Sequence, residues 1–184
     1  MRVTQTELPG VLIIEPTVFQ DARGFFLETF SAVRYEGAGV DGPFVQDNHS
    51  RSLKGSVRGL HLQATKPQGK LMRAVSGSIL DVAVDVRVGS PTFGRWTSVL
   101  LSGDNFKQLY VPPGFAHGFA ALSDLVDVEY KCTDYYDPKD ELTVLWNDPA
   151  IGIQWLTTEP ALSARDRAAR PLCELMDRLP RFIP

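Results

Sequence analysis

Two side chains that lie close together in the sequence are suited to proton-transfer chemistry. Residues 58–63 read RGLHLQ, and Lys70 follows His61 by nine residues. Histidine titrates near neutral pH and serves well as a general base, while a lysine ammonium stabilises negative charge that develops on an oxygen. We expect the two residues to lie on neighbouring strands. Together they could remove a proton next to a ketone.

The alternation of side chains along a strand bears on what surrounds His61. It places Val57, Gly59 and Gln63 on the same face as the imidazole. Gly59 has no side chain, which would allow a ligand to approach the imidazole closely. Arg58 points to the opposite face under strict alternation, so it reaches the same pocket only if the strand bulges at Gly59.

Lys70, Tyr130 and Asp166 are further acid–base candidates. Lys70 shares a strand face with Met72 and Ala74, where a lysine is costly unless it is paired or functional; alternatively, it extends its ammonium to solvent. Tyr130 lies on the apolar face of its predicted strand and therefore points toward a core or a cavity. Asp166 follows Ser163 at a capping-box spacing, so its carboxylate either acts in a site or only caps a helix.

Residues 112–119 raise the question of a metal. They contain the P-x-G-x-x-H spacing of the second cupin motif, which ends at His117. Metal-binding cupins also carry His-x-His and a glutamate on an earlier strand, whereas this chain has His61-x-Gln63 and no suitably spaced glutamate. An amide in place of an imidazole makes a poor divalent-metal site, so a metal-dependent cupin enzyme is the alternative interpretation. Without a metal, His117 hydrogen-bonds a substrate or packs.

Short apolar or alternating segments, separated by glycine- and proline-rich turns, dominate the chain. We expect strands at 11–14, 25–30, 44–50, 56–63, 70–75, 79–86, 96–101, 108–111, 126–133 and 142–146. The segments 70–75 and 79–86 form a predicted hairpin around Gly77. This pattern predicts an all-β fold, a cupin-like jelly-roll β-sandwich or barrel with short C-terminal helices. We expect one domain over residues 1–184, with a jelly-roll core at about 10–157 and a helical tail at about 160–184.

Composition excludes several other classes of protein. The 184 residues carry a net charge of −3 and form no basic stripe, which argues against nucleic-acid binding. The N-terminus lacks the apolar core of a signal peptide, and no apolar run is long enough to span a membrane. Two cysteines are too few for a disulfide framework, so we expect reduced thiols and a cytoplasmic protein.

A set of motifs, taken together and in order, resembles the dTDP-4-dehydrorhamnose 3,5-epimerase family over residues 5 to about 170. The motifs are Asp21-x-Arg23-Gly24-x-Phe26-x-Glu28, Gln46-x-Asn48-x-Ser50, Arg58-Gly59-Leu60-His61-x-Gln63, Gly69-Lys70-Leu71, Ser90-Pro91-Thr92-Phe93-Gly94-x-Trp96, Gly114-Phe115-Ala116-His117-Gly118-Phe119, Tyr130-Lys131 and Trp146-Asn147-Asp148-Pro149.

The resemblance implies a fold, an activity and a set of residue roles. It implies a metal-free, cofactor-free jelly roll, usually a homodimer, that epimerises C3 and C5 of dTDP-4-dehydro-6-deoxy-glucose to give dTDP-4-dehydro-L-rhamnose. His61 is similar to the family's base, Tyr130 to its acid, Asp166 to the carboxylate that orients the histidine, and Lys70 to the cation beside the C4 oxygen. Substrate-contacting positions match Arg23, Glu28, Gln46, Asn48, Arg58, His117, Glu141 and Arg165, of which Arg23 and Glu28 are expected to reach the site of the other subunit.

The chemistry explains why such residues are needed. The C3 and C5 protons both lie next to the C4 ketone, so removing either gives an enolate that Lys70 and Arg58 could stabilise. Inversion requires a proton on the opposite face, for which Tyr130 is the inward acid.

Two departures from the family pattern and three alternatives accompany this interpretation. The interval from His61 to Lys70 is one residue shorter than expected, and Arg165 stands where many relatives carry lysine, a change that alters contact geometry. The alternatives are a monofunctional 3- or 5-epimerase of an antibiotic-sugar pathway, the metal-dependent cupin enzyme, and a non-catalytic nucleotide-sugar-binding domain.

Overall fold

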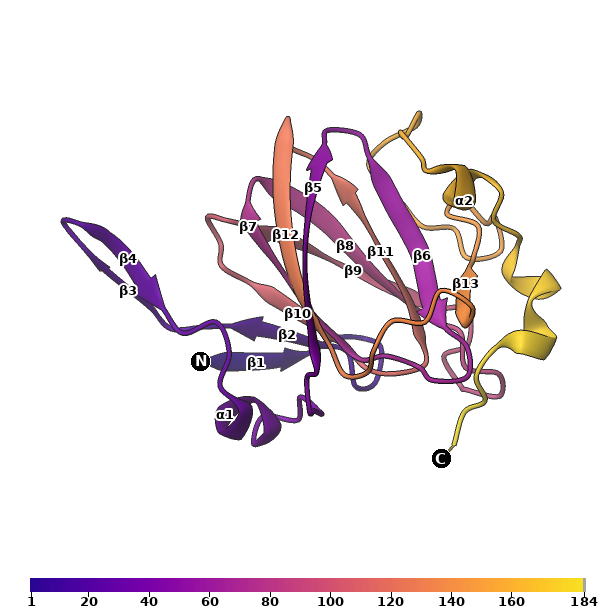
Figure 1. Cartoon of the computed structure of the whole chain (residues 1–184), viewed down its shortest axis with the longest axis horizontal. Coiled ribbons are helices and arrows are strands. Elements are labelled where there is room, and N and C mark those ends of the chain that lie inside the picture. The colour runs from indigo at the N-terminus through magenta and orange to yellow at the C-terminus, as the bar shows by residue number, and fades with distance from the viewer. Residues whose placement is uncertain (184) are drawn as a thin grey trace.

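Two antiparallel sheets face each other in the computed structural model, which describes residues 1–183 (Figure 1). The first sheet runs in the order β1 (Arg2–Gln5), β2 (Leu12–Glu15), β10 (Gln108–Val111), β7 (Lys70–Ser76), β12 (Leu125–Cys132) and β5 (Gln46–Leu53). The second runs in the order β13 (Glu141–Thr143), β6 (Val57–Gln63), β11 (Phe115–Ala121), β8 (Ser78–Asp85) and β9 (Trp96–Ser102).

The remaining elements lie outside these sheets. A hairpin of β3 (Val18–Asp21) and β4 (Gly24–Leu27) precedes the helix α1 (Ala32–Glu36). The C-terminal segment holds α2 (Ala164–Arg167) and the short 3₁₀ helices η1 (Leu172–Glu174) and η2 (Met176–Arg178). The predicted all-β fold with short C-terminal helices is therefore confirmed, and β5 to β12 follow the strand order of a jelly roll.

The predicted hairpin between 70–75 and 79–86 is wrong. β7 pairs with β10 and β12 in the first sheet, whereas β8 pairs with β11 and β9 in the second. Gly77 forms the corner between the sheets with a φ of +69°, and a Cβ there would lie 2.4 Å from the carbonyl oxygen of Leu125. The sequence analysis expected His61 and Lys70 on neighbouring strands, and this expectation is wrong. The two residues lie on different sheets, His61 on β6 and Lys70 on β7.

The space between the sheets is filled by the inward side chains of both. Met72 and Ala74 of β7 meet Val126 and Val128 of β12 in one buried cluster, which Tyr130 borders. The predicted inward faces of these two strands are thereby confirmed. The cluster occupies part of the barrel, and a cavity occupies the rest.

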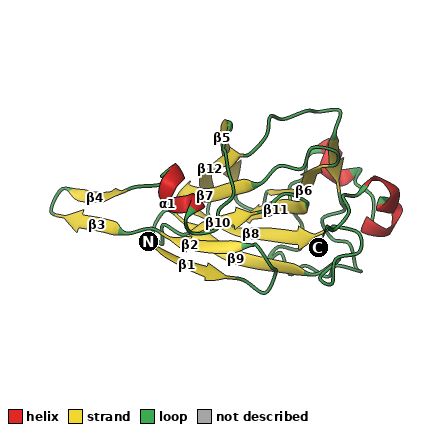
Figure 2. Cartoon of the chain, turned by 90° about the horizontal axis from the view of Figure 1, so that it is seen from below, coloured by secondary structure: helices red, strands yellow, loops and turns green. Residues whose placement is uncertain are grey.

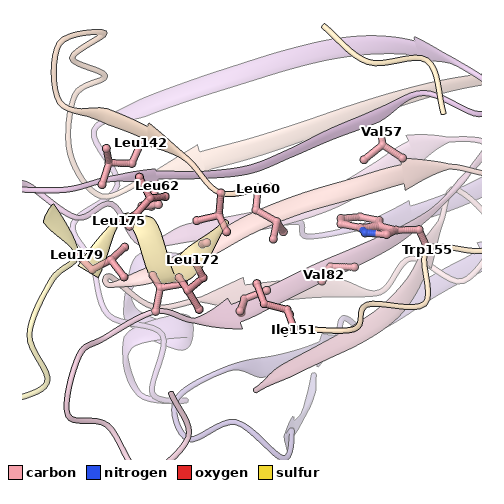
Figure 3. Packing of buried hydrophobic residues seen from close by; sticks show 14 of the residues in the cluster. Val57, Leu60, Leu62, Val82, Leu142, Ile151, Trp155, Leu172, Leu175 and Leu179 are labelled. Atoms are coloured by element: carbon pink, nitrogen blue, oxygen red, sulfur yellow. The ribbon is translucent and has the colours of Figure 1, made fainter. Parts of the chain in front are cut away.

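A second apolar cluster lies behind the second sheet, under the C-terminal segment. Leu60 and Leu62 of β6 and Val82 of β8 pack there against Trp155 and Leu172 (Figure 3). The alternating apolar set of β8 thus faces the tail, and its aspartates face the barrel. Because both faces of the second sheet are covered, the tail is held firmly enough to contribute side chains to the barrel.

The β3–β4 hairpin stands away from the two sheets, at the end of the molecule opposite the C-terminal helices (Figures 1 and 2). Phe19, Phe25 and Phe26 on it are 62%, 58% and 69% exposed. Exposed aromatic side chains gathered on one projecting element are typical of a surface that binds another protein. Within residues 1–183, no helix is both long and apolar enough to cross a membrane.

Candidate active site

A cavity of about 660 Å³ opens between the two sheets. Both sheets and the C-terminal segment line it, with His61, Gln63 and His117 on one side, Lys70 and Tyr130 on the other, and Asp166 from the tail. The first sheet also contributes Gln46, Asn48 and Ser50 from β5. The barrel therefore brings together residues that lie as far apart in the sequence as β5 and α2.

The imidazole of His61 is paired with the carboxylate of Asp166. His61 Nε2 lies 2.6 Å from Asp166 Oδ1, and the Asp166 side chain is 3% exposed. Burial alone would raise the pKa of Asp166, but the hydrogen bonds with His61 and Ser163 outweigh it and hold the pKa below its ordinary value. An ionised Asp166 accepts a hydrogen bond from the Nε2–H of a neutral His61, so that the lone pair of the ring is on Nδ1.

The first turn of α2 fixes Asp166. Ser163 caps the helix by accepting a hydrogen bond from the Asp166 backbone N–H at 3.1 Å, and its hydroxyl donates to Asp166 Oδ2 at 2.8 Å. Ser163 therefore caps the helix, and the same turn presents the Asp166 carboxylate to His61, so this carboxylate does more than cap a helix.

Glu141 lines the cavity on the other side of His61, and Arg165 pairs with it. Glu141 Oε1 lies 4.0 Å from His61 Nδ1, and Glu141 Oε2 pairs with Arg165. The hydroxyl of Tyr136 donates to the same carboxylate oxygen at 2.7 Å. Glu141 thus lies close to His61, with Arg165 attached to it, and their predicted contacts with the substrate stay predictions.

A second imidazole–carboxylate pair lies at the floor of the cavity. His117 Nε2 is 2.8 Å from Asp81 Oδ1, and their side chains are 6% and 0% exposed. His117 is the register partner of His61 between β11 and β6. His117 lines the cavity and is held by Asp81, whose role the sequence had not suggested.

Lys70 and Tyr130 line the cavity from the first sheet, facing the sheet of His61. Burial lowers the pKa of Lys70, although the nearby Cys132 and Asp81 act in the opposite direction. Burial raises the pKa of Tyr130, with Cys132 reinforcing and Arg58 opposing the shift. Lys70 therefore lines the cavity rather than extending along the surface, and the raised pKa keeps the phenol of Tyr130 protonated at neutral pH.

Arg58 reaches the cavity because β6 bulges. His61 pairs with His117, and Arg58 pairs with Phe119. Between these two pairs β6 contains one residue more than β11, which makes a β-bulge. The predicted reason for Gly59 is wrong: a Cβ there would lie 2.6 Å from the Cα of Gly118, so a neighbouring strand, not a ligand, makes the close approach.

Gln46 and Asn48 line the cavity and are joined by a hydrogen bond of 3.0 Å from Gln46 Nε2 to Asn48 Oδ1, while their predicted contacts with the substrate stay predictions. Arg23 and Glu28 are not near this cavity. Arg23 lies on the projecting hairpin and pairs with Asp21, and Glu28 follows the hairpin and pairs with Arg34. Their predicted contribution to the site of another subunit stays a prediction.

The sequence interpretation missed several residues of the cavity wall. Ser163, Tyr136 and Gln68 line it, and Asp81 supports it from behind His117. The one available signal was the alternation of 79–86, whose aspartates share a face. In the part of the chain that the structure describes, no group of three or more His, Cys, Asp and Glu side chains is placed to hold a metal ion.

Fold and site together define a jelly-roll protein in which a histidine–carboxylate pair, a partly buried lysine and a partly buried tyrosine surround one cavity, a set of groups suited to acid–base chemistry on a polar substrate. The family model for dTDP-4-dehydrorhamnose 3,5-epimerase matches residues 5–174. The chain belongs to the dTDP-4-dehydrorhamnose 3,5-epimerase family, and the predicted resemblance is confirmed.

Individual relatives are similar over most of the chain. A dTDP-4-dehydrorhamnose 3,5-epimerase from Salmonella typhimurium is 52% identical over 92% of this chain and 94% of its own length. One from Neisseria gonorrhoeae is 53% identical over 92% of this chain, which spans 52% of that protein. A dTDP-6-deoxy-D-glucose-3,5-epimerase from Legionella pneumophila, solved in complex with dTDP-4-keto-L-rhamnose, superposes with a TM-score of 0.97 at 48% identity, covering 100% of this chain and 99% of that one.

Proposed function

We propose that this chain epimerises dTDP-4-dehydro-6-deoxy-glucose at C3 and C5, giving dTDP-4-dehydro-L-rhamnose. The observation that carries the proposal is the 2.6 Å contact between His61 Nε2 and Asp166 Oδ1 at the wall of a cavity that Lys70 and Tyr130 line from the other sheet. A base oriented by a carboxylate, a cation and an acid are the groups that this reaction needs.

Proton removal is the first step. His61 takes the proton from C3 or C5 through its free ring nitrogen, and Asp166 stabilises the imidazolium that forms. The electron pair of the broken C–H bond forms a double bond to C4, and the C4 oxygen becomes an enolate oxygen. Lys70 places its ammonium at that oxygen. Preorganised charge of this kind typically lowers a barrier by a few kcal/mol, worth about 10² to 10³ in rate.

Inversion is the second step. Tyr130 gives its phenolic proton to the opposite face of the same carbon, and the C4 carbonyl re-forms. His61 and Tyr130 come from different sheets, so a sugar ring between the sheets presents opposite faces to them. The cycle leaves a protonated histidine and a tyrosinate, and exchange with water restores both.

We also propose that the enzyme works as a homodimer in the cytoplasm. The β3–β4 hairpin exposes three phenylalanines and carries Arg23, whose side chain is 89% exposed, away from its own cavity. A second copy of the chain would bury these phenylalanines and receive Arg23 and Glu28 at its site. The two cysteines are free, which suits a reducing compartment.

The experiment is to follow the reaction by NMR in D₂O, at C3 and C5 separately. Inversion with deuterium at both carbons supports the proposal. Inversion at one carbon alone would establish the monofunctional alternative, and dTDP binding without exchange would establish the non-catalytic one. Activity that is lost on chelation and restored by a divalent metal would establish the metal-dependent alternative.

A further inference from the structure

We propose that the side-chain amide of Gln63 positions the substrate, its Nε2 donating a hydrogen bond to an acceptor oxygen of the bound nucleotide sugar. This inference rests on the proposed function and adds a contact to it. The sequence singled out Gln63 only as the residue that stands where a metal-binding cupin has histidine.

Burial and orientation carry the first part of the argument. Gln63 is 3% exposed and lines the cavity, two residues along β6 from His61. Its Oε1 accepts a hydrogen bond from the backbone N–H of Asp137 at 3.0 Å. Because only the oxygen of an amide can accept that bond, the orientation of the side chain is fixed and Nε2 is directed elsewhere.

The amide nitrogen carries the second part. Gln63 Nε2 is buried and has no hydrogen-bond partner among residues 1–183. A buried N–H without an acceptor is costly, and native proteins leave few of them. An acceptor oxygen in the cavity would remove this cost, and the hydroxyl, ketone and phosphate oxygens of a nucleotide sugar are all such acceptors.

Among the glutamines of the cavity wall, only Gln63 has a side-chain amide nitrogen without an acceptor in the described part of the chain. Gln68 Nε2 donates to the carbonyl oxygen of Asp134 at 2.6 Å, and Gln46 Nε2 donates to Asn48 at 3.0 Å. The backbone of the segment 134–137 hydrogen-bonds to all three glutamine side chains, Gln46, Gln63 and Gln68. Gln46 accepts its hydrogen bond from the backbone N–H of Tyr136. Gln63 does so through its oxygen and keeps its nitrogen for the cavity.

This arrangement supplies a matched control. Gln63→Leu removes both the contact to the segment 134–137 and the free donor, whereas Gln68→Leu removes only a contact to that segment. Titration calorimetry with dTDP and with dTDP-glucose, which has no ketone and does not react, separates the two effects. We expect Gln63→Leu to weaken the binding of dTDP-glucose about tenfold more than Gln68→Leu does.

The two probes locate the acceptor oxygen. A specific loss for dTDP-glucose places the oxygen on the sugar, and an equal loss for dTDP places it on the nucleotide diphosphate; either result supports the inference. Equal affinities of the Gln63→Leu and Gln68→Leu proteins for both probes would overturn it, because Gln63 would then act only through the segment 134–137.

A second variant guards against a general loss of structure. Gln63→Glu keeps an acceptor for the Asp137 N–H but offers no donor when ionised. Its buried carboxylate costs stability, so we expect a lower melting temperature than that of the wild type, but a protein that is still folded at the temperature of the titration and has lost dTDP-glucose affinity at least tenfold. Unchanged affinity in this variant would also overturn the inference. If the affinity of Gln63→Glu is unchanged but the wild type epimerises its substrate normally, only the inference about Gln63 fails and the proposed function stands. If the wild type binds neither probe, the inference and the proposed function both fail.

Discussion

The two ring nitrogens of His61 face two carboxylates at different distances. Nε2 lies 2.6 Å from Asp166, while Nδ1 lies 4.0 Å from Glu141, whose carboxylate is engaged by Arg165 and Tyr136. The short contact fixes the tautomer, and the long one leaves Nδ1 available for a proton. The position of the imidazole therefore depends on two elements, β6, which carries His61, and the C-terminal segment, which carries Asp166.

At this scale, Tyr130→Phe tests the division of labour between base and acid. We expect the variant to incorporate deuterium at C3 and C5, because His61 is intact, but to form inverted product at least 100-fold more slowly, since a positioned acid is typically worth about 10² to 10⁴ in rate. NMR in D₂O measures both quantities. Normal inversion in the variant would assign the acid role to another group.

The sequence located this set of residues better than it explained them. The motifs led to His61, Lys70, Tyr130 and Asp166, and the structure places all four at one cavity, while their roles stay predictions. Asp81 was missed because its partner, His117, lies 36 residues away on another strand. A local pattern shows that a carboxylate faces inward but not which side chain it meets.

At the scale of the element, strands were easier to predict than their partners. The alternation along 79–86 indicated a strand correctly, but the short connection to 70–75 suggested a hairpin, and the two strands lie in different sheets. Strand periodicity comes from which faces are buried, whereas pairing is decided by which edges are free in the assembled barrel. The sequence also did not decide whether β6 has a bulge, because the bulge depends on the approach of Gly118 to Gly59.

The end of β8 shows how one buried carboxylate holds several elements. Asp85, which is fully buried, accepts hydrogen bonds from the side chains of Arg87, Ser90 and Thr92. The Arg87 guanidinium in turn lies over the ring of Phe115 at 4.3 Å and that of Phe182 at 5.1 Å. The motif around Ser90 is thereby tied to the C-terminal segment.

Asp85 gives a stability prediction with a definite pH dependence. Burial raises the pKa of Asp85, but Arg87, Ser90 and Thr92 lower it more, so the folded-state pKa lies below the ordinary value of about 3.9. The stabilisation is therefore complete well above pH 4 and is lost as the pH falls through the folded-state pKa.

We expect Asp85→Ala to lower the free energy of unfolding by about 3 kcal/mol at pH 7, because it leaves the partly buried guanidinium of Arg87 without its carboxylate partner. Asp85→Asn should flatten the loss of stability between about pH 5 and pH 3. Urea unfolding across this range measures both effects, with the exposed Asp104→Asn as the control. An acid dependence in Asp85→Asn equal to that of the wild type would contradict the account.

At the scale of the whole molecule, the two ends of the chain have different relations to the cavity. The C-terminal segment packs on the second sheet and brings Asp166 to His61. The hairpin of β3 and β4 extends away from the two sheets (Figure 1), and its Arg23 is not among the residues that line the cavity. In a dimer that exchanges hairpins, each site would contain Asp166 from its own subunit and Arg23 from the other subunit.

Mixing two inactive variants tests this shared site. We expect Arg23→Ala and His61→Ala to be nearly inactive alone, and their mixture, after denaturation and refolding together, to recover about a quarter of wild-type activity, because half of the random dimers carry one intact site. Refolded wild type is the control for yield. No recovery, with mixed dimers demonstrated by mass spectrometry, would show that Arg23 serves its own subunit or none.

The most direct test of the central claim, that one histidine removes both protons, compares two of the three histidines of the chain, His61 and His49. Deuterium incorporation into dTDP-4-dehydro-6-deoxy-glucose is followed by NMR at C3 and C5 for the wild type, His61→Ala and His49→Ala. His49 lies outside the cavity and contacts Asp127, so its variant serves as the control. We predict loss of exchange at both carbons in His61→Ala alone. Robust exchange at either carbon in that variant would contradict the account.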